Sequence, residues 1–431
     1  MNEKFILYLW TFQLFQKELS TTDGQPIDVL SPGTRNQDSG PDFFNGKIKI
    51  GDTLWAGNIE IHVKASDWYR HHHHLDEAYS NIILHVVYEN DRSVERKNGE
   101  PIPVLELKHK FDPQLLLQYE DFLSTMHPIP CHQQIGRVNH FTMMNFMDAL
   151  MIERLKDKTT SILHYLNTLN HDFNETFYQK LCRNFGFKTN TDAMEQLAKS
   201  IPLSVISKHQ DNLFQLEALF FGQAGFLSTP FTGRYPKQLL VEYQFLKEKY
   251  HLQPMDKKVW KFMRMRPANF PTIRIAQLAA VLSKTSNIFH AMLHANKLSH
   301  ILSLFEASAS DYWNDHFHFD QTAPPNRPKK IGQSSTHLLI INTIVPFLFI
   351  YGEYTGRHEL HQKALDWLEQ LPSEKNGITR LYAQLGLEVN SALQSQALLQ
   401  LKTNYCDTKR CLECRLGHEI LRKNTDFQPS N

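Results

Sequence analysis

Residues 58–68, "NIEIHVKASDW", carry side chains capable of chemistry in the alternating pattern of a β-strand. Successive side chains of a strand point to opposite faces, so Glu60, His62 and Lys64 share one face and the apolar residues between them share the other. A carboxylate, an imidazole and an ammonium on one face can hold a metal ion, move a proton and stabilise negative charge. The alternative is a solvated face on which Glu60 and Lys64 form an ordinary exposed pair.

A second carboxylate is expected beside Glu60. Asp42 follows a Gly-Pro pair in "DSGPDFF", and such a turn fixes the backbone immediately before the next strand. Asp42 precedes Glu60 by eighteen residues with a Gly-Asp turn between them, which predicts that the two lie at the ends of paired antiparallel strands. Two carboxylates so placed can share Mg²⁺ or Mn²⁺, while His62 or Lys64 orients the attacking water.

These residues resemble the PD-(D/E)XK nuclease-like superfamily, in which an aspartate after a proline and a Glu-x-Lys triplet form the site. Pro41-Asp42 matches the first part, and Glu60-Ile61-His62 lies where Glu-x-Lys is expected. His62 replaces the lysine, and Lys64 follows two residues later on the same face. The resemblance implies a restriction-endonuclease-like domain with catalytic residues Asp42, Glu60, His62 and Lys64. Glu3, at the start of the first predicted helix, is a candidate for an outer carboxylate.

A longer resemblance covers almost the whole chain. The run from Gly40 to Val87, "GPDF…WAGNIEIH…SDW…ILHVV", resembles the hallmark of an uncharacterised bacterial family known as a domain of unknown function. Further matching segments are "FGQAG" at 221–225, "RMRPANFPTIR" at 264–274, "INTIVPFLFIYG" at 341–352 and "CDTKRCLEC" at 406–414. This resemblance implies no established activity.

An internal histidine run follows the strand, in "DWYRHHHHLDEAYSN". His71, His73 and His74, together with Asp76, can bind zinc, or can join the site if they approach Asp42 and Glu60. The alternative is a polar loop whose histidines are solvated.

Three cysteines near the C-terminus, Cys406, Cys411 and Cys414, form a C-x4-C-x2-C pattern. The two-residue spacing is that of a metal knuckle, in which both thiolates reach one ion. His418 or the distant Cys131 can supply a fourth ligand, which predicts a zinc or iron–sulfur site. The alternative is a set of buried or surface thiols in a helical tail.

A basic segment, "MDKKVWKFMRMRPANFPTIR", interleaves cations with aromatic residues. Its candidates for contact with DNA or RNA are Lys257, Lys258, Lys261, Arg264, Arg266 and Arg274. Arginines that brace a helix end in a helical bundle are the alternative.

These motifs predict a metal-dependent nuclease that acts on DNA or RNA. One alternative is a catalytically inactive nucleic-acid-binding or scaffold protein with the same fold, and another is a zinc-dependent hydrolase built from the histidine run. A Lys64 amine near both carboxylates favours the nuclease. Convergence of His71, His73 and Asp76 favours the zinc hydrolase.

The composition is that of a globular cytoplasmic protein. Of 431 residues, 41% are hydrophobic and 21% are charged, which suits a sizeable core. The formal net charge of +1 shows no global basic excess, so a nucleic-acid surface would be a local patch. The N-terminus lacks the features of a signal peptide, and the apolar run at 338–352 is too short to span a bilayer comfortably. Five cysteines suit a reducing compartment.

The elements that must position the candidate residues fall into three regions. Residues 1–110 are predicted to be α/β, with a helix over 1–20, a turn-rich segment over 20–42, and strands at 43–50, 53–64, 81–89 and 101–108. Residues 111–400 are predicted to be α-helical, and residues 401–431 form a cysteine-bearing tail. The clearest helical periodicity lies at 140–166, 175–187, 191–209, 212–227 and 236–250, and a Pro-rich loop is expected at 320–335. The predicted fold is an α/β domain with a mixed sheet flanked by helices, followed by a larger all-α region.

Overall fold

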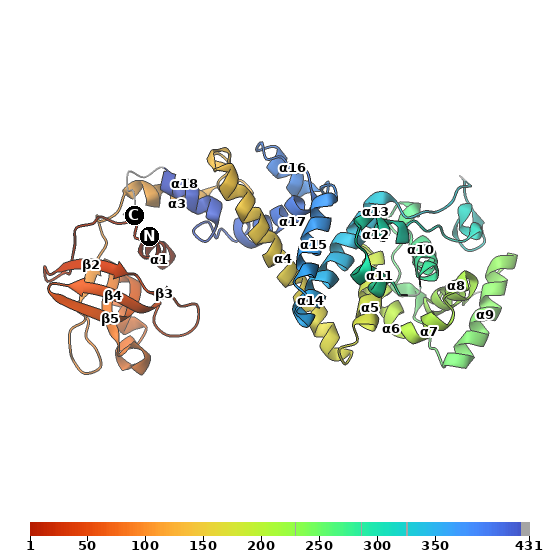
Figure 1. The fold of residues 1–431 in the computed structure, drawn as a ribbon, viewed down its shortest axis with the longest axis horizontal. Helices are drawn as coiled ribbons and strands as arrows, with labels where there is room; N and C mark the ends of the chain where they lie inside the picture. The colour runs from red at the N-terminus through yellow and green to blue at the C-terminus, as the bar shows by residue number, and fades with distance from the viewer. Residues whose placement is uncertain (229, 286, 325, 424–431) are drawn as a thin grey trace. The chain divides into compact units, whose positions relative to one another are not determined.

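The computed structural model describes residues 1–228, 230–285, 287–324 and 326–423, and it forms two compact units (Figure 1). The first unit comprises Met1–Asp148, Arg380–Glu388 and the chain from Leu398 onward, and the second comprises Ala149–Thr379 and Val389–Ala397. The C-terminal segment therefore belongs to the same unit as the N-terminal sheet, although the two are far apart in sequence.

A mixed sheet forms the centre of the first unit. Within the described residues its seven strands are β1 (Leu19–Ser20), β2 (Pro26–Ser31), β3 (Thr34–Arg35), β4 (Phe43–Ile50), β5 (Thr53–Lys64), β6 (Ile82–Glu89) and β7 (Val104–Glu106). Their order is β1-β2-β4-β5-β6-β7, and β3 pairs with β4. The pairs β2–β4 and β4–β5 are antiparallel, whereas β5–β6 and β6–β7 are parallel. The predicted N-terminal α/β region is thereby confirmed.

The segment between the first helix and Asp42 was predicted to contain turns, and this prediction was wrong in part. It contains β2 and β3, which pair with β4; in β2, Ile27 lies opposite Ile50 and Val29 opposite Ile48. Ile27 is buried in the core of the sheet. β2 forms because β4 supplies its hydrogen-bonding partners. This pairing cannot be recognised from the local sequence of β2.

Helix α1 (Glu3–Thr11) packs on the sheet, and its fully buried Ile6 and Trp10 belong to the same core cluster as Ile59 and Ile61 of β5. The Asn2 side chain caps the helix by accepting a hydrogen bond from the Phe5 amide at 3.0 Å. The helix ends at Thr11 and does not continue to residue 20 as predicted. Gln13 takes a left-handed conformation (φ 50°), and the Leu14 amide donates to the Leu9 carbonyl at 2.9 Å, a pattern typical of helix ends.

Shorter helices complete the first unit. They are α2 (Asp67–Arg70), η1 (His73–Leu75), η2 (Glu77–Tyr79), α3 (Pro113–Ser124), η3 (Ile135–Arg137), η8 (Leu401–Cys406) and α18 (Arg415–Lys423). A second apolar cluster, which includes Trp68, Ile82 and Val104, packs α2 and η2 against the sheet. Three helices cross the boundaries between the units: α4 (His140–Thr168), α16 (Gly377–Ala383) and α17 (Ala392–Gln400).

The second unit is mainly helical, which confirms the predicted all-α region in outline. Its helices are α5 (Phe173–Phe185), α6 (Thr191–Ser200), α7 (Leu203–Lys208), α8 (Leu213–Gln223), α9 (Arg234–Tyr250), η4 (Lys257–Val259), η5 (Pro267–Asn269), α10 (Pro271–Lys284), α11 (Ile288–His294), α12 (Leu298–Leu304), η6 (Asp311–Asn314), α13 (Gln333–Leu339), η7 (Ile340–Ile344), α14 (Val345–Thr355) and α15 (Glu359–Gln370). A small hairpin joins β8 (His316–His318) to β9 (Gln321–Thr322).

The helical stretch Gln333–Thr355 is long and apolar enough to cross a membrane, and no other stretch of the described residues is. Of its most apolar window, 72% is buried inside the protein. This burial is that of the core helix of a soluble protein.

The close approach of β5 to β6 generates a stability prediction. A methyl group at Gly57 would lie 2.8 Å from the Asn81 carbonyl oxygen and 2.5 Å from Ile83 Cγ2, so we expect Gly57→Ala to force the strands apart. Overpacking of this kind costs about 1–3 kcal/mol. The measurement is the free energy of unfolding from urea denaturation. Gly136→Ala, where no atom lies within 4 Å of the added carbon, is the matched control and should be neutral. Equal stability of the two variants would contradict the close packing of β5 and β6.

Candidate functional site

The carboxylates of Asp42 and Glu60 are held side by side at one end of the pairing between β4 and β5. The Asp42 amide donates to Glu60 Oε2 at 3.1 Å, and the Ile61 amide donates to Asp42 Oδ2 at 3.0 Å. Phe43, the residue after Asp42, lies opposite Ile59, the residue before Glu60. The structure therefore brings together the two carboxylates that the sequence placed on adjacent strands.

The electrostatics of the Asp42–Glu60 pair favour the binding of a cation. Burial, and then the neighbouring Glu60 carboxylate, raise the pKa of Asp42 to about 7. Burial, with Glu3 as a further negative neighbour, raises the pKa of Glu60 to about 8. Arg35, the residue of β3 that lies opposite Phe43, acts in the other direction and lowers the pKa of Asp42. An ion bound between the carboxylates would relieve this repulsion.

Three histidines gather beside Glu60, and two of them, His62 and His73, contact its carboxylate. His62 comes from the same strand, whereas His71 follows α2 and His73 begins η1. His72 between them adopts a left-handed conformation (φ 61°), which redirects the chain within the histidine run. Among the described residues, His62, His71 and His73 form a group whose ligand atoms all lie within 4.8 Å of one another.

The separations in this group suit a single tetrahedral ion. His62 Nε2 lies 3.1 Å from His71 Nδ1, His73 Nε2 lies 3.3 Å from Glu60 Oε1, and His62 Nε2 lies 3.6 Å from the same oxygen. Donor atoms about 2.1 Å from a tetrahedral ion lie roughly 3.4 Å from one another. Three imidazole nitrogens therefore offer a three-ligand set, and Glu60 Oε1 lies close to two of them, those of His62 and His73.

The imidazole of His62 is held neutral and oriented for such a role. Burial, and then the neighbouring histidines, lower its pKa to about 2, and burial also lowers the pKa of His73. His62 Nδ1 lies 2.8 Å from Nε2 of the fully buried His85. A metal on His62 Nε2 would place the ring proton on Nδ1, from which it is donated to His85. Trp68 packs against both His73 and His85.

Of the other residues predicted for this site, Glu3 lies near it, whereas Lys64 and Asp76 are exposed. Glu3 is near, because its charge acts on Asp42, Glu60 and the histidines of the turn. Lys64 is exposed, and its charge acts on Asp91; within the described chain its amine makes no hydrogen bond or ion pair with either carboxylate. Asp76 is also exposed, and it caps η2 by accepting from the Ala78 amide at 2.9 Å.

The four cysteines predicted to bind metal lie in one neighbourhood. Cys131, Cys406, Cys411 and Cys414 are all buried, and the pKa of the Cys131 thiol is raised by burial and then by the other three thiols. His418 has other neighbours. Its Nδ1 is 3.0 Å from the Tyr8 hydroxyl, and the centre of its ring lies 4.0 Å from that of Phe12. Cys131 therefore fits the group better than His418 does.

The basic segment lies in the second unit. Five of its six candidate cations are exposed: Lys257, Lys258, Lys261, Arg264 and Arg266. Arg274 is 7% exposed, donates to Gln277 and Asn269 at 3.0 and 2.6 Å, and lies over the Phe187 ring. Arg274 thus stabilises the fold, in agreement with the alternative that arginines of this segment brace a helix end.

Sequence reasoning missed Arg35. Its strand, β3, was assigned to a turn, so no signal placed a cation beside Asp42. Only the pairing of β3 with β4 brings Arg35 next to the carboxylates.

The repulsion in the carboxylate pair predicts how stability depends on pH. Because both pKa values are raised in the folded state, the two carboxyl groups bind more protons in folded than in unfolded protein between about pH 4 and 8. The lowered pKa values of His62 and His73 have the opposite effect below about pH 6.5. The free energy of unfolding of the metal-free protein should therefore fall as pH rises from about 6.5 to 8. Glu60→Gln should stabilise the metal-free protein at pH 7.5 by roughly 1–2 kcal/mol.

Thermal unfolding in EDTA at several pH values measures this effect. Asp52→Asn, which removes an exposed carboxylate in the β4–β5 turn, is the control and should change little. A Glu60→Gln protein less stable than the unmodified protein at pH 7.5 would show that the pair is not electrostatically strained.

Comparison with known proteins places the chain in a family without naming an activity. The sequence matches, over residues 3–377, the family model described as a protein of unknown function, DUF2851. No curated protein and no solved structure matches the chain. Since the matched residues make up most of the sequence, the protein belongs to the DUF2851 family.

Proposed function

We propose that the first unit is a metal-dependent phosphodiesterase that hydrolyses DNA or RNA. The observation that carries the proposal is the grouping of His62, His71 and His73 next to Glu60, which His62 and His73 contact, beside a second, half-buried carboxylate. Buried carboxylates with raised pKa values next to neutral imidazoles are typical of functional sites. Such a set has no evident structural purpose in a sheet already held by its apolar core.

The ligand set favours a transition metal over Mg²⁺. Imidazole nitrogens suit Zn²⁺ and carboxylate oxygens suit Mn²⁺, whereas Mg²⁺ takes oxygen ligands and retains its water. The sequence predicted Mg²⁺ or Mn²⁺ on Asp42 and Glu60 alone. The three imidazoles narrow the proposal to Mn²⁺ or Zn²⁺, held by them and by Glu60 Oε1.

Each residue then has a role. An ion held there would lower the pKa of a bound water and take up charge from a phosphate oxygen. Asp42 holds the Ile61 amide through Oδ2, and its Oδ1 accepts the proton of the attacking water. Arg35 is exposed beside Asp42 and contacts the phosphate, whereas the sequence had assigned the orientation of the attacking water to Lys64 or His62. His85 orients His62 and does not touch substrate.

The order of elements supports the same proposal. Helix α1, the antiparallel strands β2, β4 and β5, a helical crossover and the parallel strand β6 follow one another as in the core that the PD-(D/E)XK resemblance implies. Glu60 lies on the third strand of that order, and Asp42 immediately precedes the second. We therefore propose a nuclease-like fold for this unit, with His62 in place of the usual lysine.

Replacement of one imidazole should remove the metal. We expect His73→Ala to weaken Mn²⁺ or Zn²⁺ binding by more than about 100-fold, because a ligand contributes more than the outer residues whose loss costs 10–100-fold. Isothermal titration calorimetry measures the affinity. His72→Asn is the matched control, since His72 lies outside the group and asparagine tolerates its left-handed conformation. Equal affinity in both variants would exclude the histidine site.

Activity assays separate the competing functions. Cleavage of single- and double-stranded DNA and RNA, and of bis(p-nitrophenyl) phosphate, should need Mn²⁺ or Zn²⁺ and should fall at least ~100-fold in Asp42→Ala and Glu60→Ala. Equal activity in all variants would contradict the proposal. Cleavage of the small diester alone would point to a zinc hydrolase of small substrates. A protein that binds metal but cleaves nothing would be the inactive binding or scaffold protein.

We also propose that Cys131, Cys406, Cys411 and Cys414 hold a second, structural metal centre. Four buried thiols are the ligand set of a zinc site or an iron–sulfur cluster. As far as the chain is described, no three of these sulfur atoms lie within 4.8 Å of one another, and this wider spacing favours a cluster over a single ion. All five cysteines are free, which agrees with the reducing cytoplasm that we propose as the location.

The second centre makes its own prediction. Cys131→Ser should lower the iron or zinc content of the purified protein to near zero and destabilise it by several kcal/mol, because loss of a ligand leaves buried thiols without their ion. Elemental analysis and the absorption spectrum measure the content. Cys182→Ser replaces a buried cysteine of α5 and should leave the metal in place. Anaerobically purified protein that contains neither iron nor zinc would refute the proposed centre.

A further inference from the structure

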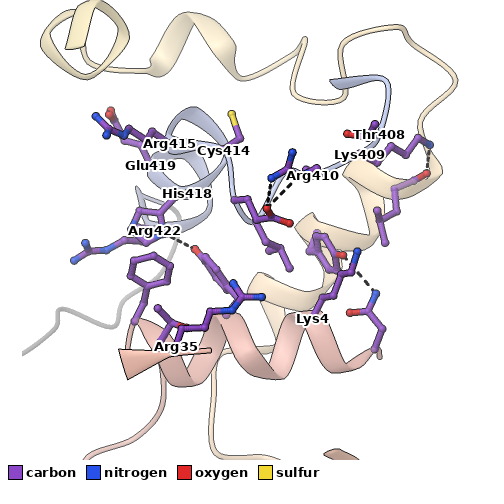
Figure 2. A pocket seen from close by; sticks show the side chains of 18 of the residues that line it. Lys4, Arg35, Thr408, Lys409, Arg410, Cys414, Arg415, His418, Glu419 and Arg422 are labelled. Carbon is purple, nitrogen blue, oxygen red and sulfur yellow. Dashed lines mark hydrogen bonds and ion pairs between the residues drawn. The ribbon is translucent and has the colours of Figure 1, made fainter. Parts of the chain in front are cut away.

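A cavity of about 1460 Å³ lies in the first unit, between the N-terminal helix and the C-terminal segment. Figure 2 shows Lys4 and Arg35 on one side, and Arg410, His418 and Arg422 on the other. Its volume exceeds the ~300–1,000 Å³ of pockets that bind small molecules. The cavity therefore suits a segment of a longer ligand.

The lining of the cavity is strongly basic. Seven lysine and arginine residues line it against three glutamates, whereas the whole chain has 46 basic and 45 acidic residues. Arg410 pairs with Glu413, and Lys423 pairs with Glu419. In the described part of the chain, Lys4, Arg35, Lys409 and Arg415 form no ion pair, so their charge is available to an anionic ligand.

Several of these cations are held in place by neutral partners. The Lys409 amine donates to the carbonyl oxygens of Leu123 and Thr125, and Arg415 donates to Asn145 Oδ1 at 2.5 Å. A cation fixed by a neutral acceptor keeps its net charge and needs little reordering to bind an anion. The wall is thus prearranged for phosphate groups.

An exposed aromatic ring lies in the charged wall. Phe12 is 39% exposed, and its ring lies 4.0 Å from that of His418, whereas Tyr8, whose hydroxyl is bonded to His418, is buried. Cations beside an exposed ring suit single-stranded nucleic acid, since an unpaired base can stack on the ring. An acidic peptide would use the cations alone.

The cavity adjoins the metal site. Glu3 and Arg35 line the cavity, and Arg35 lies opposite Phe43, the residue after Asp42, where β3 pairs with β4. A strand in the cavity would therefore lead toward the carboxylates and histidines.

We propose that this cavity binds single-stranded DNA or RNA through its phosphates and guides the strand to the metal site. The binding itself does not depend on hydrolysis; only the guiding of the strand rests on the function proposed above. The C-terminal segment, residues 408–423, is then part of the substrate-binding surface.

The test is fluorescence anisotropy of a labelled single-stranded oligonucleotide of about 12 nucleotides, within the ~4–16 that such grooves cover. EDTA is present, so no cleavage occurs. The double variant Arg35→Gln/Arg415→Gln should raise the Kd at least ~10-fold and reduce the slope of log K against log salt by about 1.4, or ~0.7 for each lost contact. Lys47→Gln/Lys49→Gln removes the same charge from exposed positions of β4 outside the cavity and should change neither.

Three results would overturn the cavity proposal: no binding by the unmodified protein, equal loss in both double variants, or equal binding of a duplex. Competition by polyglutamate as strong as that by unlabelled oligonucleotide would overturn the assignment to nucleic acid. Phe12→Ala should weaken binding with no change in the salt slope, since it removes a ring and no charge. Binding without metal-dependent cleavage would contradict only the proposed hydrolysis and leave the cavity proposal standing.

Discussion

Two hydrogen bonds between Asp42 and the Glu60 region determine the arrangement on which the site depends. Each carboxylate accepts a backbone amide from the other strand, so the bulged pairing of β4 with β5 also fixes both acids. The resulting negative pair, a buried Glu60 and a half-buried Asp42, is disfavoured unless protons or a cation compensate it, in line with the raised pKa values of both groups. A fold that retains this repulsion needs a ligand to explain it, and the three imidazoles grouped beside Glu60 indicate a metal ion.

The C-terminal segment links this site to the rest of the first unit. It begins two residues after Cys406, carries Cys411 and Cys414, and supplies most of the cations of the basic cavity, which Cys414 itself lines. A metal held by Cys131 and the three later cysteines would fix residues 406–414 to the N-terminal part of the chain. In this account one metal does the chemistry, and the other keeps the substrate-binding wall in place.

Much of the secondary structure could be predicted from the sequence, because it rests on local patterns. The strands at 43–50 and 53–64 follow from their alternation and the turn between them, and β6 follows from its apolar run. β2 and β3 could not be predicted, because each needs β4 as a partner. The candidate metal ligands were also visible as residue types. Their grouping was not, because it depends on the left-handed conformation of His72, on the placement of Cys131 by tertiary packing, and on an Arg35 that replaces the expected Lys64.

The central claim is that one transition-metal ion sits among His62, His71, His73 and Glu60. The most direct measurement is anomalous X-ray diffraction from crystals soaked in Zn²⁺ or Mn²⁺. The account predicts an anomalous peak about 2.0–2.2 Å from His62 Nε2, His71 Nδ1, His73 Nε2 and Glu60 Oε1. A strong peak at the cysteines with none at the histidines, in crystals grown near neutral pH, would contradict it.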